Sequence, residues 1–199
     1  MKLYKFRTLD NLEFVLDIIL NERLFCSSLE SLNDPLEGLF YSVVRSRRTH
    51  KMIRKYKTID SLLQYEADLR ICSLSCSLDD IRMWSHYANG HTGVAIEVDF
   101  ENFLNDVTKV NYDNGLQKNS KSTCPHDVLS YKTKHWDYEN EYRIIQDEEY
   151  YSIKGRISAV YFGVKSLDFH KELLRKSVSE DIKLLDTRLD RKEVVVRPI

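Results

Sequence analysis

Ionisable and aromatic side chains gather in residues 134–143, which read Lys-His-Trp-Asp-Tyr-Glu-Asn-Glu-Tyr-Arg. Glu139 and Glu141 are two residues apart, so on an extended backbone their carboxylates point to the same side. Paired carboxylates can divide the chemistry of a site: one stabilises positive charge, and the other serves as an acid, a base or an orienting group. The alternative is a solvated strand face on which Arg143 pairs with one of the two glutamates.

Two other segments combine polar and aromatic residues. Residues 4–7 read Tyr-Lys-Phe-Arg, and residues 73–75 read Ser-Leu-Ser, followed at a short distance by Trp84, His86 and Tyr87. Clustered Trp, His, Tyr and acidic residues are typical of ligand pockets, and unpaired polar groups in buried strands cost ~1 to 3 kcal/mol each. We therefore expect the three segments to lie on neighbouring strands that line one cleft. Both tryptophans are expected to be largely buried.

Short strands and helices must position these side chains. Alternating apolar and polar residues predict strands over residues 3–7, 71–77, 93–100, 142–146 and 157–164. Helical spacing and capping residues predict helices over residues 9–21, 81–87, 126–137 and 168–178. The order has no regular β-α-β rhythm. It predicts one α+β domain over residues 1–199 with a central, largely antiparallel sheet.

A basic stretch follows the first turn-rich loop. Residues 45–57 contain seven Lys and Arg residues and no acid, and apolar residues at helical spacing predict one or two helices over residues 45–69. If the stretch binds phosphate, a nucleic acid is its partner. The alternative, which we favour, is a solvated amphipathic helix with Met52, Ile53 and Tyr56 packed inward, so weak or no nucleic-acid binding is expected.

The composition limits the class of protein. The chain has 199 residues, 42% of them hydrophobic, and 30 Lys and Arg against 31 Asp and Glu. This is enough for one buried core, and the net charge of -1 excludes a surface that binds polyanions all over. No apolar run approaches the ~18 residues of a membrane span, and residues 1–7 lack the apolar region of a signal peptide. We expect no membrane partner and a cytoplasmic location.

The cysteines and histidines give little basis for a metal or a disulfide. On a strand, Cys72 and Cys76 would share a face about 13 Å apart, too far for a disulfide. No Cys-x-x-Cys, His-x-x-x-His or His-Glu-x-x-His motif is present. We therefore expect no bound metal. We expect all four cysteines, Cys26, Cys72, Cys76 and Cys124, to be reduced thiols in the core.

Several motifs together resemble the bacterial family catalogued as domain of unknown function 2971 (DUF2971). The resemblance spans nearly the whole chain. Its motifs are residues 3–7 (Leu-Tyr-Lys-Phe-Arg), 32–37 (Leu-Asn-Asp-Pro-Leu-Glu), 72–75 (Cys-Ser-Leu-Ser), 84–88 (Trp-Ser-His-Tyr-Ala), 93–96 (Gly-Val-Ala-Ile) and 136–145 (Trp-Asp-Tyr-Glu-Asn-Glu-Tyr-Arg-Ile-Ile).

The chain also resembles, more distantly, the ADP-ribosyltransferase superfamily. Those enzymes carry a His or Arg on an N-terminal strand, then a strand with Ser or Tyr, then a Glu or Gln-x-Glu motif. The resemblance implies an ADP-ribosyltransferase-like fold in which Glu141 contacts the nicotinamide ribose and stabilises an oxocarbenium-like transition state, while Glu139 orients the acceptor. The implied cofactor-binding residues are Lys5, Arg7, Ser73, Ser75, Trp84, His86 and Tyr87, with Lys5 or Arg7 on the NAD pyrophosphate. Lys5 stands where many such enzymes carry His.

The resemblance thus implies an NAD-consuming enzyme, either an ADP-ribosyltransferase or an NAD glycohydrolase. Its small-molecule partner is a nucleotide, and its acceptor is a protein or a nucleic acid. The alternative is a catalytically inert recognition domain in which the same cluster binds a nucleotide, a peptide or a nucleic acid.

Overall fold

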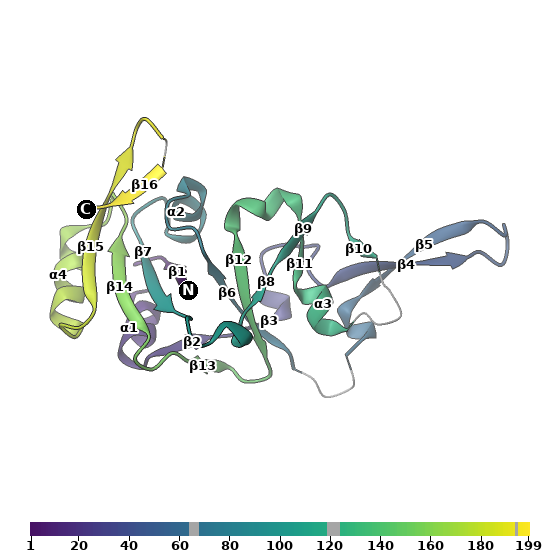
Figure 1. The fold of residues 1–199 in the computed structure, drawn as a ribbon, viewed down its shortest axis with the longest axis horizontal. Helices are drawn as coiled ribbons and strands as arrows, with labels where there is room; N and C mark the ends of the chain where they lie inside the picture. The colour runs from purple at the N-terminus through teal and green to yellow at the C-terminus, as the bar shows by residue number, and fades with distance from the viewer. Residues whose placement is uncertain (64–67, 119–123, 194) are drawn as a thin grey trace.

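Nine strands form a central sheet in residues 1–63, 68–118, 124–193 and 195–199, the part of the chain that the computed structural model describes (Figure 1). Neighbouring strands pair antiparallel except β14 and β15, which are parallel. The order is β16 (Val195–Pro198), β15 (Lys183–Asp190), β14 (Ile157–Phe162), β7 (Val94–Asp99), β1 (Lys2–Arg7), β6 (Arg70–Ser75), β12 (Glu141–Gln146) and β8 (Thr108–Lys109), with β3 (Ser27–Ser28) also on β6. A mixed architecture with a largely antiparallel sheet is confirmed.

Helices pack against both faces of this sheet. They are α1 (Leu12–Leu20), α2 (Ile81–Tyr87), α3 (Pro125–Leu129) and α4 (Asp168–Ser177). Helix α1 buries Val15 and Ile18 in the same cluster as Leu3, whereas α2 buries Trp84 against Phe6. Leu3 and Phe6 point to opposite faces of β1, so the two helices lie on opposite sides of the sheet. In the described ranges, no helix is both long and apolar enough to cross a membrane.

Smaller sheets flank the central sheet. β4 (Leu39–Arg45) and β5 (Met52–Thr58) form an antiparallel hairpin that β10 (Gln117–Lys118) joins. The other pairs are β9 (Asn111–Asp113) with β11 (Tyr131–Thr133), and β2 (Arg23–Phe25) with β13 (Tyr150–Ser152). The β4 and β5 hairpin projects away from the body (Figure 1). We call residues 39–58 the arm.

The arm replaces the helix that was expected over residues 45–69. The prediction is wrong for residues 45–58, 62–63 and 68–69, whereas a short 3-10 helix, η2 (Ile59–Ser61), is present at residues 59–61. Residues 64–67 lie outside the described part. Met52 and Ile53 match a helical period, but each pairs across the hairpin with β4, with Met52 opposite Arg45 and Ile53 opposite Val44. The spacing of apolar residues within one segment does not reveal a strand partner that lies seven or more residues away.

Other differences are smaller. The helix expected over residues 126–137 covers only residues 125–129, and the chain then continues as β11 and the 3-10 helix η4 (Lys134–Glu139). Cys26 and Cys72 are buried thiols as expected, but Cys76, directly after β6, and Cys124, directly before α3, are exposed. Trp136, expected to be largely buried, is half-buried.

Candidate functional site

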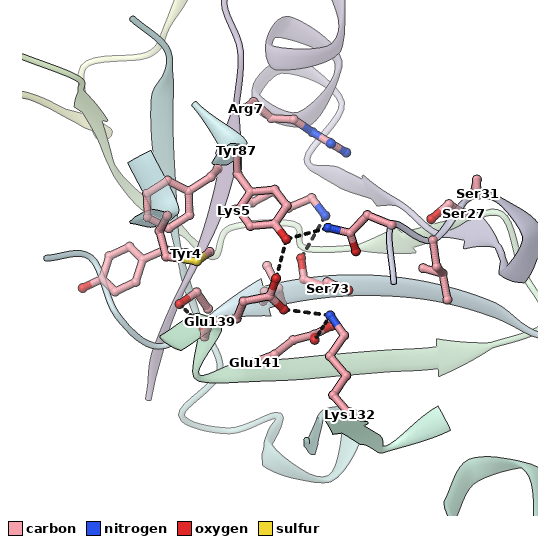
Figure 2. Close-up of a pocket in the computed structure, with 16 residues that line it drawn as sticks. Tyr4, Lys5, Arg7, Ser27, Ser31, Ser73, Tyr87, Lys132, Glu139 and Glu141 are labelled. Carbon is pink, nitrogen blue, oxygen red and sulfur yellow. Dashed lines mark hydrogen bonds and ion pairs between the residues drawn. The ribbon is translucent and has the colours of Figure 1, made fainter. Parts of the chain in front are cut away.

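A cleft opens where β1 and β6 part. Strand β1 pairs with β7 at all 6 of its residues, whereas in the described chain its pairing with β6 is the single pair Tyr4 and Ser75. The cavity there measures about 230 Å³, a little below the ~300 to 1,000 Å³ of typical ligand pockets. All three segments singled out by the sequence line it, as expected (Figure 2). Its lining is Tyr4, Lys5, Phe6, Arg7, Ser27, Ser31, Leu32, Asn33, Ser73, Leu74, Ser75, Met83, Tyr87, Lys132, Glu139 and Glu141.

Two cations of β1 form one side of this cleft (Figure 2). Lys5 Nζ donates a hydrogen bond of 2.8 Å to the carbonyl oxygen of Ser73, across the gap between the strands. Arg7 Nε is buried without a hydrogen-bond partner, and neither cation contacts a carboxylate among the residues described. Burial lowers the pKa of both groups. A buried charge is costly unless it is paired, so this side of the cleft is complementary to an anion.

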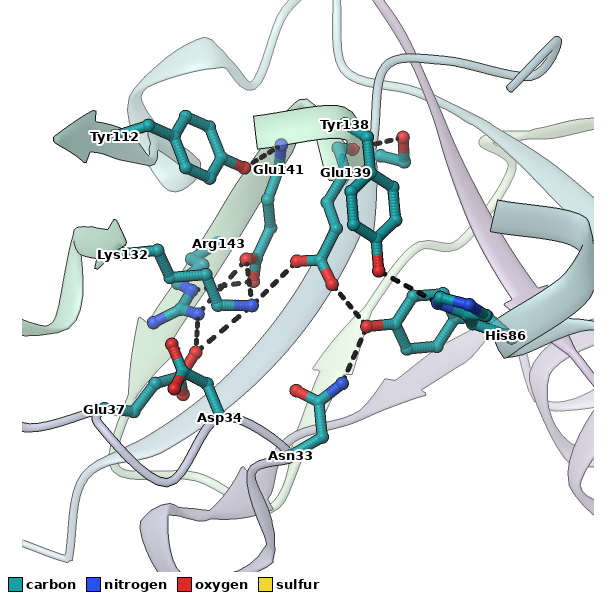
Figure 3. A network of polar contacts seen from close by, with 12 residues as sticks. Asn33, Asp34, Glu37, His86, Tyr112, Lys132, Tyr138, Glu139, Glu141 and Arg143 are labelled. Atoms are coloured by element: carbon teal, nitrogen blue, oxygen red, sulfur yellow. Dashed lines mark hydrogen bonds and ion pairs between the residues drawn. The ribbon is translucent and has the colours of Figure 1, made fainter. Parts of the chain in front are cut away.

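A buried ion network forms the other side (Figure 3). Lys132 Nζ lies 2.7 Å from Glu139 Oε2, 2.8 Å from Glu141 Oε2 and 3.2 Å from Glu37 Oε1. Arg143 Nε lies 2.7 Å from Glu141 Oε1, and its Nη2 binds Glu37. Each of the five side chains is at most 5% exposed, so the solvated strand face is wrong although Arg143 does pair with Glu141. Three carboxylates meet two cations, which leaves the network one negative charge in excess.

A sharp backbone turn brings the two glutamates together. Glu139 ends η4, Asn140 adopts the left-handed conformation at φ 43° and ψ 50°, and Glu141 begins β12. Asparagine adopts this conformation more readily than most residues. Here its Nδ2 also donates to Ser77 Oγ at 2.9 Å, a tertiary contact with the chain that follows β6. Ser75 Oγ fixes the turn by donating to the carbonyl oxygen of Glu139 at 2.6 Å. The expectation of extended backbone through both glutamates is wrong, but their carboxylates still converge.

The pKa values of the two carboxylates shift in opposite directions. Burial would raise the pKa of Glu141, but Arg143 and Lys132 outweigh it and hold the pKa at about 2. For Glu139 burial is the larger effect and raises the pKa above its usual range, against the opposing effect of Lys132. The Tyr87 hydroxyl donates to Glu139 Oε1, and burial together with Glu139 raises the pKa of Tyr87. Such a pair can give a catalytic site one carboxylate that stabilises positive charge and one that carries a proton.

Two residues of the predicted cofactor site lie outside the lining of the cleft. Trp84 is 0% exposed; its ring packs edge-on against Phe6 at 5.2 Å, and its Nε1 donates to the carbonyl oxygen of Leu78 at 2.6 Å. His86 Nδ1 lies 2.9 Å from the Tyr138 hydroxyl. Trp84 thus attaches α2 to β1, and His86 attaches it to η4. The other five predicted residues, Lys5, Arg7, Ser73, Ser75 and Tyr87, do line the cleft.

Three residues of the site were not assigned a role from the sequence. Glu37 and Asn33 lie in the 32–37 motif, which contributed to the family resemblance but gave no indication of their partners. Asn33 Nδ2 donates to the Tyr87 hydroxyl at 2.7 Å (Figure 3). Lys132, which binds three carboxylates, stands in the short strand β11 and carries no local signal.

One comparison with known proteins gives a match. No curated protein matches this chain, and neither does any solved structure. A family model described as "Protein of unknown function (DUF2971)" matches residues 83–144. The matched segment includes Tyr87, Lys132, Glu139, Glu141 and Arg143, so it carries most of the ion network. The match supports a relationship between this chain and the DUF2971 family.

Proposed function

We propose that the cleft binds a nucleotide of the NAD type and cleaves the bond between nicotinamide and ribose, by transfer or by hydrolysis, on an ADP-ribosyltransferase-like fold. One observation carries the proposal: two cations that have no carboxylate partner in the described chain share a cavity with two buried carboxylates whose pKa values shift in opposite directions. A phosphate ester of ribose has the complementary form, with anionic oxygens at one end and a carbon that becomes cationic at the other.

Binding would begin at Lys5 and Arg7. Charge-assisted hydrogen bonds from an ammonium and a guanidinium to phosphate oxygens are roughly twice as strong as neutral ones. The phosphate would also supply a counterion, which these two partly buried groups lack among the residues described. The cavity of about 230 Å³ is small for a whole dinucleotide, so we expect the nicotinamide ribose inside and the adenosine outside.

The chemical step would use the carboxylates. The bond from ribose C1′ to the nicotinamide nitrogen breaks, its electron pair leaves with nicotinamide, and C1′ becomes an oxocarbenium-like centre. Glu141, ionised at neutral pH, would stabilise that positive charge more in the transition state than in the ground state. Water or an acceptor hydroxyl then bonds to C1′ and gives its proton to Glu139, whose raised pKa favours proton uptake.

A second candidate function is a recognition domain that binds a nucleotide without cleaving it. The observation that favours it is the saturation of Glu141: both carboxylate oxygens are already held by Arg143 and Lys132. Catalysis by Glu141 requires that one of these contacts give way as the cationic ribose forms. Binding alone requires no such change.

The test measures nicotinamide and binding separately. Purified protein is incubated with NAD, with and without cell extract as a source of acceptor, and free nicotinamide is quantified. Glu141→Gln keeps the volume and removes the charge, and should lower release on the order of 10²-fold. Glu148→Gln, an exposed carboxylate, is the matched control and should leave release unchanged.

Calorimetry with NAD and with ADP-ribose separates the two candidates. Binding that Arg7→Met abolishes, without nicotinamide release, would establish the recognition domain. Absence of both binding and release would reject both functions for this cleft.

A further inference from the structure

The arm concentrates positive charge on a chain that is otherwise acidic. Residues 39–58 contain seven Lys and Arg residues and no Asp or Glu. The other 179 residues hold the remaining 23 Lys and Arg against all 31 Asp and Glu, a net charge of -8. The arm is therefore a basic projection on an acidic body. This polarity orients a polyanion toward the arm and away from the rest of the surface.

The outer part of the arm, residues 43–45 and 51–56, is open to solvent. Met52 is 63% exposed, Ile53 46% and Tyr56 61%. An amphipathic helix required these three side chains to pack inward, and that helix was the reason to expect no nucleic-acid binding. With the helix replaced by a projecting hairpin, the reason no longer holds.

Both faces of the arm combine cationic and apolar side chains. Tyr41 and Tyr56 pair on the same face as Arg54, whose guanidinium lies 4.7 Å from the centre of the Tyr41 ring. Lys55 and Ile53 lie on the other face, two residues apart on the same strand. A membrane-binding hairpin would gather its apolar residues on one face. A ribbon with cations on both faces is suited to a ligand that surrounds it.

We propose that the arm binds duplex DNA by entering the major groove. A two-stranded antiparallel ribbon fits this groove, which is about 12 Å wide and flanked by phosphates on both sides. Strands of seven residues span about 23 Å, roughly two thirds of a helical turn. Cations on both faces can then reach both phosphate backbones at once. This proposal does not depend on the chemistry in the cleft.

The experiment uses the full chain and a labelled DNA duplex of mixed sequence, followed by fluorescence anisotropy at several salt concentrations. About three phosphate contacts give a log–log slope of about −2.7, so a fourfold rise in salt should weaken binding by about 40-fold. Reversing three exposed arm charges together (Arg47→Glu, Lys51→Glu and Lys55→Glu) should weaken binding at least tenfold and remove most of that slope.

The control reverses three exposed charges elsewhere (Lys154→Glu, Lys176→Glu and Arg188→Glu), which changes the net charge by the same amount. It should retain the affinity and the slope of the unaltered protein. Thermal unfolding of both triple variants verifies that they are folded.

Several outcomes overturn the proposal. Equal losses in the two triple variants would indicate a general charge effect. Tighter binding of single-stranded DNA or of RNA of the same length would exclude the major groove. Binding to vesicles containing phosphatidylserine, without binding to DNA, would make the arm a membrane contact.

Discussion

At the scale of single residues, the fully buried Arg143 and the partly buried Arg7 have opposite relations to their surroundings. Arg143 is bound by Glu141 and Glu37, whereas Arg7 has no carboxylate partner in the residues described. Arg143→Met should lower the free energy of unfolding by ~3 to 5 kcal/mol, because it leaves carboxylates buried without their cation. Arg7→Met should leave it unchanged or raise it, because it removes a partly buried charge that has no carboxylate partner in the described chain.

Urea unfolding of the two variants at neutral pH checks this contrast. An equal loss in Arg7→Met would mean that Arg7 already has a stabilising partner in the free protein. The anion site that we assign to it would then be wrong.

The pH dependence of the free energy of unfolding should reveal the ionisation of Glu141. Its pKa falls from the ordinary 4.5 to about 2 on folding. A depressed pKa contributes stability above the unfolded value that is lost as the pH falls through the folded value, here about 3 kcal/mol between about pH 5 and pH 2. The difference in unfolding free energy between the unaltered protein and Glu141→Gln should be largest above pH 5. It should shrink as the pH approaches 2.

Urea titrations at three pH values measure this difference, with Glu148→Gln as the exposed control. A constant difference across the range would show that the charge of Glu141 does not stabilise the fold.

The sequence identified one half of the site better than the other. Glu139, Glu141 and the 73–75 segment could be recognised because their spacing and composition are local. Glu37 and Lys132 could not, because the partner of a buried charge is set by tertiary contacts across many residues. The same limit explains Arg143: the alternative interpretation paired it with one of the two glutamates on a solvated face, but its burial was not expected.

At the scale of elements, α2 packs on one face of the sheet and also contributes Tyr87 to the cleft. Asp80 caps it, accepting from the backbone N–H of Arg82 at 2.8 Å, and the last turn places Tyr87 at Glu139. Trp84→Ala should lower the free energy of unfolding by ~3 to 5 kcal/mol, since the ring is wholly buried against Phe6.

Trp136→Ala is the comparison for that variant. Because Trp136 is only half-buried, its truncation should cost clearly less. Chemical unfolding of both variants gives the two values. An unchanged stability of Trp84→Ala would contradict the role of α2 in the core.

Strands and helices differed in how well the sequence predicted them. β7 and α2 were predicted because each buries its own apolar pattern, at periods of two and 3.6 residues respectively. The arm was not, because Met52, Ile53 and Tyr56 stay exposed and their spacing reports no buried face. The separation of β1 from β6 was also beyond prediction, since it depends on how two strands diverge after a single pair.

At the scale of the whole molecule, the cleft and the arm are built from different parts of the chain. The cleft lies between strands of the central sheet, whereas the arm extends outward from it (Figure 1). At the base of the arm, Phe40 and the adjoining Ile59 are buried in the core, whereas the outer residues 43–45 and 51–56 are exposed. The outer arm therefore contributes little to the core, and we expect it to be separable from the cleft.

Shortening the arm tests this separation. Val43 and Arg54 face each other in the hairpin, so replacing residues 44–53 by Asn-Gly closes it with a two-residue turn. The free energy of unfolding should stay within about 1 kcal/mol, because the removed side chains are mostly exposed. Nicotinamide release and NAD binding should persist, while binding to duplex DNA should be lost with the four cations removed. A shortened protein that loses NAD binding while it remains folded would show that arm and cleft act as one site.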